Sequence, residues 1–136
     1  MATAMTKVYS FVEALAEQKI DLSGTGLTIA LTNTAHTTTW TKLADLTQVS
    51  YTNCSARVIT VSTSAQTTGT YKLVCADLTL TASGAVGPFQ YIYIYDDDAT
   101  DDDLVCYYDY GSAVTLANGD TFVIDFDATN GVLTIA

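Results

Sequence analysis

The 136-residue sequence is poor in positive charge and in the residue types on which most enzymes depend. Five Lys and Arg residues stand against fifteen Asp and Glu, which gives a formal net charge of −10. Binding to nucleic acid or to an anionic membrane surface needs clustered Lys and Arg, and no such cluster is present. The single His and the three Cys show no zinc-ligand spacing. We therefore expect no nucleic acid, no membrane and no cofactor as partners.

Long hydrophobic runs are also missing. No apolar run approaches the roughly 18 residues that a membrane span requires. The first ten residues lack the basic and apolar regions of a secretory signal, so we expect synthesis in a cytosol. In that compartment Cys54, Cys75 and Cys106 are expected to be reduced and mostly buried. A bond between Cys75 and Cys106 stays open as an alternative if their strands pair.

The abundant residues are β-formers. Thr occurs 24 times and Tyr nine times, while apolar residues make up 49% of the chain. Such an excess of β-branched and aromatic residues favours strands. A chain of this length buries roughly two thirds of its unfolded surface, which suffices for one core. We expect one domain over 1–136, an all-β antiparallel sandwich or barrel of about seven to eight strands with one short N-terminal helix.

The helix is predicted within residues 7–19. Its apolar face follows the spacing i, i+3, i+4, i+7 and consists of Val8, Phe11, Val12 and Leu15. Ser10 and Glu13 also match a capping box. If Ser10 is the cap, the helix starts later and Val8 lies outside it.

The strands follow from alternation and from turn residues. Alternating apolar and polar residues predict a half-buried strand from Leu27 to Thr32. Residues 33–54 are polar, Thr-rich and irregular, with one helical turn at 43–46. Further strand-like segments, separated by turn signals such as Thr68-Gly69, are 56–63, 70–81, 88–95, 104–110, 121–126 and 131–135.

Two of these segments are apolar on both faces. In 88–95 the aromatic rings share one face and two Ile the other, and 104–110 is almost as apolar. This pattern predicts a central hairpin covered on both sides. The alternative is that an aromatic face meets another subunit, because Tyr is enriched at interfaces. The candidate interface residues, from the helix and from these strands, are Val8, Phe11, Val12, Leu15, Tyr91, Tyr93, Tyr95, Tyr107 and Tyr108.

The loop from Asp96 to Asp103 carries six carboxylates in eight residues. Such charges repel one another and resist burial, so we expect a solvated hairpin tip. A basic neighbouring surface is a second interpretation. A calcium site is a third and weaker one, since the EF-hand pattern fails at its sixth and twelfth positions. Its candidate ligands are Asp96, Asp98, Asp101 and Asp103.

Catalytic motifs are not recognisable, and we expect no enzyme. The single His36 sits in a Thr-rich stretch and is predicted to be a surface loop residue. A pair of carboxylates for glycoside hydrolysis could be drawn from Asp109, Asp125 and Asp127, but the choice among fifteen acids has no specificity. Alternation places Asp125 and Asp127 on a solvated outer face.

Short motifs along nearly the whole chain resemble a family of small structural proteins of tailed bacteriophages. They include Phe11-Val12-Glu13, Ala30-Leu31-Thr32-Asn33-Thr34-Ala35, Gly69-Thr70-Tyr71-Lys72-Leu73-Val74, Gly87-Pro88-Phe89-Gln90-Tyr91, Asp109-Tyr110-Gly111 and Asp125-Phe126-Asp127-Ala128-Thr129-Asn130-Gly131-Val132-Leu133. The resemblance implies a capsid cement or decoration protein that binds the major capsid protein on the outer surface of the head, often as a trimer. This chain departs from the family in its longer acidic run at 96–103 and in Tyr107-Tyr108, where tryptophans are frequent.

Two other functions stay open at this point. A tail or baseplate structural protein would have a similar composition. A carbohydrate-binding β-sandwich would use exposed aromatic rings as sugar platforms, and the Tyr-rich strands offer such rings.

Overall fold

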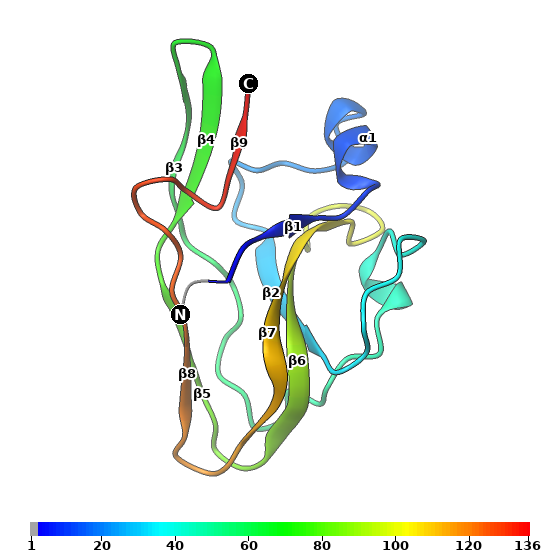
Figure 1. The fold of residues 1–136 in the computed structure, drawn as a ribbon, viewed down its shortest axis with the longest axis vertical. Helices are drawn as coiled ribbons and strands as arrows, with labels where there is room; N and C mark the ends of the chain where they lie inside the picture. Colours follow the sequence, from blue (N-terminus) through cyan, green and yellow to red (C-terminus); the bar gives the residue numbers. More distant parts are fainter. Residues whose placement is uncertain (1–2) are drawn as a thin grey trace.

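A computed structural model describes residues 3–136, and within them the chain forms nine strands and one short α-helix (Figure 1). The all-β class is confirmed, because antiparallel sheets pack as two layers. One layer has the strand order β1-β7-β6-β2. Its strands are β1 (Thr6–Lys7), β7 (Leu104–Leu116), β6 (Val86–Asp96) and β2 (Leu27–Thr32). The expected central hairpin is therefore β6 and β7, the two inner strands of this layer.

The second layer consists of two shorter sheets, β3-β4-β9 and β5-β8. Their strands are β3 (Val61–Thr67), β4 (Thr70–Cys75), β9 (Leu133–Ile135), β5 (Leu78–Thr81) and β8 (Thr121–Ile124). The single segment expected at 70–81 is thus two strands. At the break between them, the Asp77 carboxylate accepts the backbone N–H of Phe126 at 2.9 Å, so a side chain takes the place of a ladder hydrogen bond.

Two strand boundaries differ by five or more residues from those expected. The segment predicted at 56–63 becomes a regular strand only at Val61, because residues before it run along the edge of β2 and bond there instead. β7 extends to Leu116, six residues beyond the expected end. The turn between β3 and β4 is Thr68-Gly69, both with positive φ (48° and 85°), as a tight two-residue hairpin requires.

The helix α1 spans Phe11–Ala16 and is shorter than the 7–19 predicted. Val8 lies outside it and donates its backbone N–H to Val105 at 3.2 Å, because the segment 6–8 is drawn into pairing with β7. Ser10 occupies the N-cap position, but its side chain makes no capping hydrogen bond. The capping box predicted from Ser10 and Glu13 is therefore not formed.

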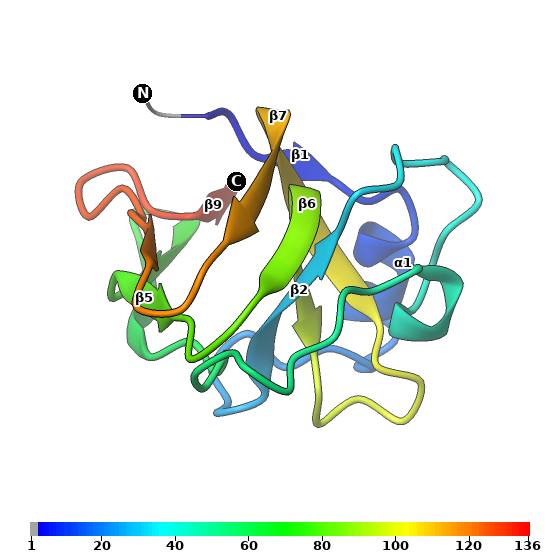
Figure 2. The same cartoon turned by 90° about the horizontal axis from the view of Figure 1, so that it is seen from below.

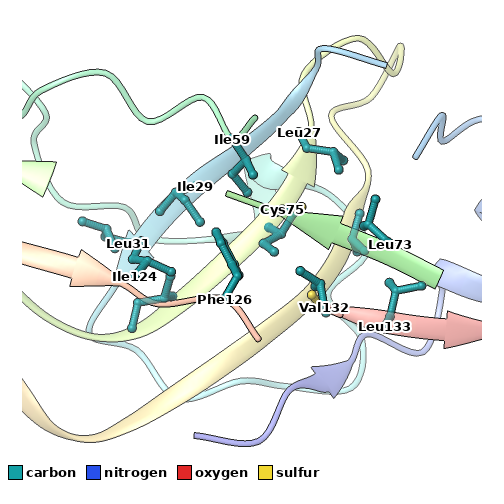
Figure 3. Close-up of a cluster of buried hydrophobic side chains, with 14 of the residues drawn as sticks. Leu27, Ile29, Leu31, Ile59, Leu73, Cys75, Ile124, Phe126, Val132 and Leu133 are labelled. Carbon is teal, nitrogen blue, oxygen red and sulfur yellow. The ribbon is translucent and has the colours of Figure 1, made fainter. Parts of the chain in front are cut away.

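The main core lies between the two layers, where side chains from β2, β4 and the end of β8 meet (Figure 3). A second apolar cluster lies on the outer face of the first layer and includes Ala30, Leu46, Tyr93 and Leu104. Figure 2 shows the first part of the connection 33–54 on the side of the first layer away from β5 and β9. Its last residues return to the end of β5, where Cys54 bridges Ala82.

The prediction of a half-buried β2 is wrong, since all six of its residues are buried. The connection 33–54 covers the face that alternation assigned to solvent. The hydroxyl of Thr28 donates to the carbonyl of Gly26 (2.9 Å) and that of Thr32 to the carbonyl of Thr47 (2.6 Å). These bonds satisfy the buried polar atoms, which would otherwise be costly to remove from water.

The three cysteines are free thiols. Cys75 and Cys106 are buried in the main core, on β4 and β7, which belong to different layers and do not pair. Burial raises the pKa of Cys75 to about 11. Burial also raises the pKa of Cys106, so both core thiols stay protonated and unreactive at neutral pH. No helix among residues 3–136 is long and apolar enough to cross a membrane.

Candidate interaction surface

The predicted apolar face of the helix divides between the core and the surface. Val8 is fully buried inside the monomer and offers no surface to a partner, and Phe11 is 3% exposed and so contributes only a small part of one. Val12 is 51% exposed, and Leu15 is half-buried. The second pair of the four candidates therefore forms most of the accessible surface.

That surface lines a groove between α1 and β9, two elements that stand at the same end of the molecule in Figure 1. The groove has a volume of about 390 Å³. Its apolar walls and floor are formed chiefly by Phe11, Val12, Leu15, Val105, Leu133 and Ile135. Among residues 3–136, the polar residues that line it are Lys7 and Thr134. Ile135 on the β9 wall is 38% exposed.

A second hollow of about 480 Å³ continues from the first, since Leu15 and Ile135 line both. It runs past the end of α1 to Asp21 and Tyr71. Hydrogen bonds from the hydroxyl and backbone N–H of Ser23 lower the pKa of the Asp21 carboxyl, which is therefore charged at neutral pH. We call the two hollows together the α1–β9 groove; it is elongated, with Lys7 near one end and Asp21 near the other.

The strands beside this groove have an edge that no other strand covers. Within residues 3–136, β9 pairs only with β4, and β1 pairs only with β7. An unpaired edge presents backbone N–H and C=O groups that can bond to a further strand. The α1–β9 groove thus combines an apolar floor with free backbone groups on its flank.

The tyrosine candidates are mostly inside the molecule. Tyr93 and Tyr95 are buried, which leaves them no surface for a partner, and Tyr91, Tyr107 and Tyr108 are half-buried. The prediction that both faces of the hairpin are covered is confirmed. The interface prediction is wrong for Tyr93 and Tyr95, because the connection 33–54 covers their face.

An aromatic cluster that the sequence did not indicate forms where this connection packs on β6 and β7. His36 stacks on Tyr107 with ring centroids 4.4 Å apart, and its Nδ1 lies 2.8 Å from the hydroxyl of Tyr93. Trp40 meets His36 edge-on at 5.7 Å. Burial lowers the pKa of His36, so the neutral ring is favoured. His36 is therefore an anchoring residue that is half-buried, and the prediction of a simple surface position is wrong. The spacing of four residues between His36 and Trp40 was the one feature of the sequence that could have indicated this cluster.

The acidic loop is solvated in part. Asp97, Asp98 and Asp101 are exposed, as expected. Asp96 is only 1% exposed, so the prediction of a fully solvated tip is wrong at this residue. Its carboxylate accepts the backbone N–H of Asp21 at 2.8 Å and that of Asp98 at 3.1 Å. These two hydrogen bonds satisfy the buried carboxyl oxygens, and the first ties the loop to the segment that follows α1.

Burial and mutual repulsion change the pKa values of two other carboxyl groups in the loop. Burial, and then the charges of neighbouring aspartates, raise the pKa of Asp102 and of Asp103. Lys19, after α1, lies close enough to Asp103 to oppose this rise. Among residues 3–136, no three His, Cys, Asp or Glu side chains are gathered to hold a metal ion. The geometry therefore gives the calcium prediction for Asp96, Asp98, Asp101 and Asp103 no support.

The other carboxylates singled out from the sequence shape local turns. Asp109 accepts the backbone N–H of Gly111 at 2.8 Å, and Asp127 accepts those of Thr129 and Asn130, both at 2.8 Å. Asp125 is exposed just after β8. Asp109 also accepts a hydrogen bond from the side-chain amide of Gln90, and Asp127 from that of Asn130. Both carboxylates are thus engaged within their own turns or hairpin.

Comparison with known proteins gives no relative: no family model matches the chain, and no curated protein or solved structure matches it.

Proposed function

We propose that this chain is a non-enzymatic structural protein of a tailed-bacteriophage virion, a cement or decoration protein that binds the major capsid protein on the outside of the head. The short motifs that run along the chain support the phage family. The structural observation that carries a binding role is the α1–β9 groove, because it leaves apolar side chains exposed beside unpaired strand edges. Such surfaces are typical of sites that a partner covers.

The polar groups support a structural role over a catalytic one. His36 is packed against aromatic rings, and Asp96, Asp109 and Asp127 each bond to backbone N–H groups of their own chain. These groups are engaged in holding loops in place. A net charge of −10 also suits the outside of a shell better than contact with packaged DNA.

The two other functions are less well supported. A tail or baseplate position fits the same fold, and imaging of the particle distinguishes it from the head. A carbohydrate site needs aromatic faces open to a sugar, whereas Tyr107 stacks against both His36 and Tyr93. Glycan binding by the isolated protein would favour that alternative.

The test is binding to heads. Particles of the phage that encodes the chain, prepared without this protein, are mixed with purified protein and sedimented. We expect co-sedimentation at a fixed number of copies per head, density on the outer shell in cryo-images, and greater loss of heads on heating when the protein is absent. Density on the tail alone, or no sedimentation with any particle, would contradict the proposal.

We further propose that the protein assembles as a homotrimer. Many copies on a lattice gain avidity from weak individual contacts, and a trimer multiplies each contact by three. Size-exclusion chromatography with light scattering at micromolar concentration measures this directly. A mass of one chain would contradict the trimer and leave the binding to heads open.

A further inference from the structure

We propose that the first hollow of the α1–β9 groove binds a single-chain aliphatic carboxylate, with the carboxylate at Lys7 and the alkyl chain over the apolar floor. The inference goes beyond the proposed structural function, because it adds a small-molecule ligand to the groove. The ligand is measured on the isolated protein and not on heads. A failure of this inference is therefore distinguishable from a failure of the proposed function.

The bottom of the first hollow is part of the main core. Val105 and Cys106 from β7 and Leu133 from β9 line it, and all three are buried. Phe11, which is 3% exposed and anchors α1 on the core, lines the same space. Water gains few hydrogen bonds in a space with such a lining, whereas an apolar ligand gains contacts there.

The volume of the first hollow suits an alkyl chain of moderate length. It measures about 390 Å³, which lies in the range of small-molecule sites. Benzene, with six carbons, occupies an apolar cavity of about 150 Å³, so roughly ten carbons can be placed here with space left at the open mouth. The hollow therefore sets an upper limit on the length of chain that it covers.

The walls of the hollow leave apolar surface for such a chain to cover. Val12 on the α1 wall is 51% exposed, and Ile135 on the β9 wall is 38% exposed. Met5 also lines the hollow, and its flexible thioether side chain can adapt to the shape of a ligand. A chain between the two walls removes apolar area of both from water.

The charges fix the sign and the orientation of the ligand. Among residues 3–136, Lys7 is the charged residue that lines the first hollow, and it is in no ion pair with them. Asp21 lines only the second hollow, and its backbone N–H is held by Asp96 at the start of the acidic loop. The carboxylate therefore lies at the Lys7 end, and the chain points toward Leu15 and Ile135, where the two hollows meet.

A polar ligand does not suit this hollow. Lys7 and Thr134 are the polar side chains of its lining among residues 3–136. A sugar or a nucleotide would give up hydrogen bonds to water from many groups and regain few of them here, which costs free energy. An aliphatic carboxylate has one polar end, and Lys7 is sufficient to meet it.

The experiment titrates the full chain with hexanoate, octanoate and decanoate at neutral pH, below the concentrations at which they form micelles. We expect the affinity in calorimetry to rise about fourfold with each added methylene, because each is buried in the hollow. Octanoate should bind about two- to fivefold more tightly than octanol, and octylammonium more weakly than either. Amide chemical shifts should move at α1, β9 and the first residues of β7.

Two pairs of variants separate the charge from the hollow. Lys7→Gln should abolish the preference for octanoate over octanol, whereas Lys42→Gln, at an exposed position outside the lining, should retain it. Ala16→Trp fills the hollow from an exposed helix position and should weaken decanoate binding at least about tenfold. Ala117→Trp, in the turn after β7, is its matched control and should leave binding unchanged.

Four results would overturn the proposal. Two of them are no binding of decanoate at millimolar concentration and an affinity that does not change with chain length. The third is octylammonium bound as tightly as octanoate, because Lys7 would then not select the ligand. The fourth is amide shifts confined to residues away from α1, β7 and β9. The shifts are measured on the unaltered protein, so the proposal stays testable if Ala16→Trp does not fold.

Discussion

The strand edges on two sides of the β-sandwich differ, because one is covered by another segment of the chain and the other is not. On the side of β2, the irregular segment 47–59 covers the strand edge, with backbone hydrogen bonds from Ile29 to Arg57 (2.9 Å), from Val49 to Leu31 (3.0 Å) and from Ile59 to Leu27 (2.8 Å). On the side of β9, the α1–β9 groove leaves the edge uncovered. An irregular segment can therefore protect an edge as well as a strand does, and the bare edge on the other side is not a necessity of the fold.

Side chains strengthen the covered side. The Tyr51 hydroxyl accepts the backbone N–H of Leu31 at 2.8 Å and donates to Gln48 at 2.9 Å. The guanidinium of Arg57 lies 3.7 Å from the centre of the Tyr51 ring and donates to the carbonyl of Ile29. One of only five basic residues thus holds this edge closed. On the open side Lys7 lines the groove and is not in an ion pair with any residue from 3 to 136.

The largest effect is expected from the core residue of the covered side. Ile59 is 2% exposed and packs in the main cluster, so Ile59→Ala should lower the free energy of unfolding by about 2–5 kcal/mol. Its neighbour Val58 is 53% exposed, and Val58→Ala is the matched control, with a change within about 0.5 kcal/mol. Urea denaturation measures both. Similar values for the two variants would show that segment 47–59 is not part of the cooperative fold.

The second-largest loss of stability is expected on removal of the Tyr51 hydroxyl, which accepts a hydrogen bond from the edge of β2. Tyr51→Phe keeps the ring under Arg57 but leaves the N–H of Leu31 without its acceptor, which should cost about 1–3 kcal/mol. Tyr71→Phe is the control, since its hydroxyl bonds only to the half-buried Ser64 at 2.7 Å and water can replace it. Equal losses would contradict a special role of Tyr51. Slower amide exchange at Leu31 in the unaltered protein would support the same bond.

Local patterns predicted the strands well, because alternation and turn residues are short-range signals. The double apolar character of 88–95 identified the central hairpin, and the turn at Thr68-Gly69 was recognised from its residues. What could not be predicted is what covers each face. β2 alternates like a half-buried strand, yet the connection 33–54, distant from β6 and β7 in sequence, buries its other face.

The residues of the candidate surface likewise could not be identified from local sequence patterns, because they depend on contacts between distant segments. Val8, Phe11, Val12 and Leu15 carry the same helical signal, but pairing of β1 with β7 pulls Val8 out of the helix and into the core. The groove depends on β9, whose three residues lie more than a hundred positions away. Asp96 is buried and accepts the backbone N–H groups of Asp98 and of Asp21, and sequence alone does not place Asp21 beside it.

A smaller effect on the free energy of unfolding, which depends on pH, tests the packing of His36 in the connection 33–54. Burial lowers the pKa of His36 below its usual 6.5, so the unfolded chain binds the proton more readily than the folded one. The stability that the neutral ring contributes is present above pH 6.5 and is lost as pH falls through that value toward the folded pKa. Unfolding should therefore become easier between pH 7.5 and 5.5 in the unaltered protein than in His36→Gln.

The comparison with His36→Gln is needed because the aspartates of the acidic loop change the folding stability with pH in the opposite direction to His36. The raised pKa values of Asp102 and Asp103 favour the folded state as pH falls toward them, in both proteins alike. Only the difference between the two melting curves reports on His36 and its contacts with Tyr93, Trp40 and Tyr107. A difference that is constant with pH would contradict the packing of His36 as the cause.

The smallest effect is expected on the open side, and it distinguishes a surface kept for a partner from one that supports the fold. Val12 is 51% exposed on α1, so Val12→Ala removes little buried area and gains helix propensity of up to about 0.7 kcal/mol. These changes oppose each other, and the free energy of unfolding should stay within about 0.5 kcal/mol of the original in urea denaturation. A loss above about 1 kcal/mol would mean that Val12 already packs within the monomer, and the two sides of the sandwich would then differ in shape but not in role. An unchanged stability means that natural selection could have placed a polar residue at Val12 without harm to the fold, so the exposed apolar side chain requires a reason outside the monomer.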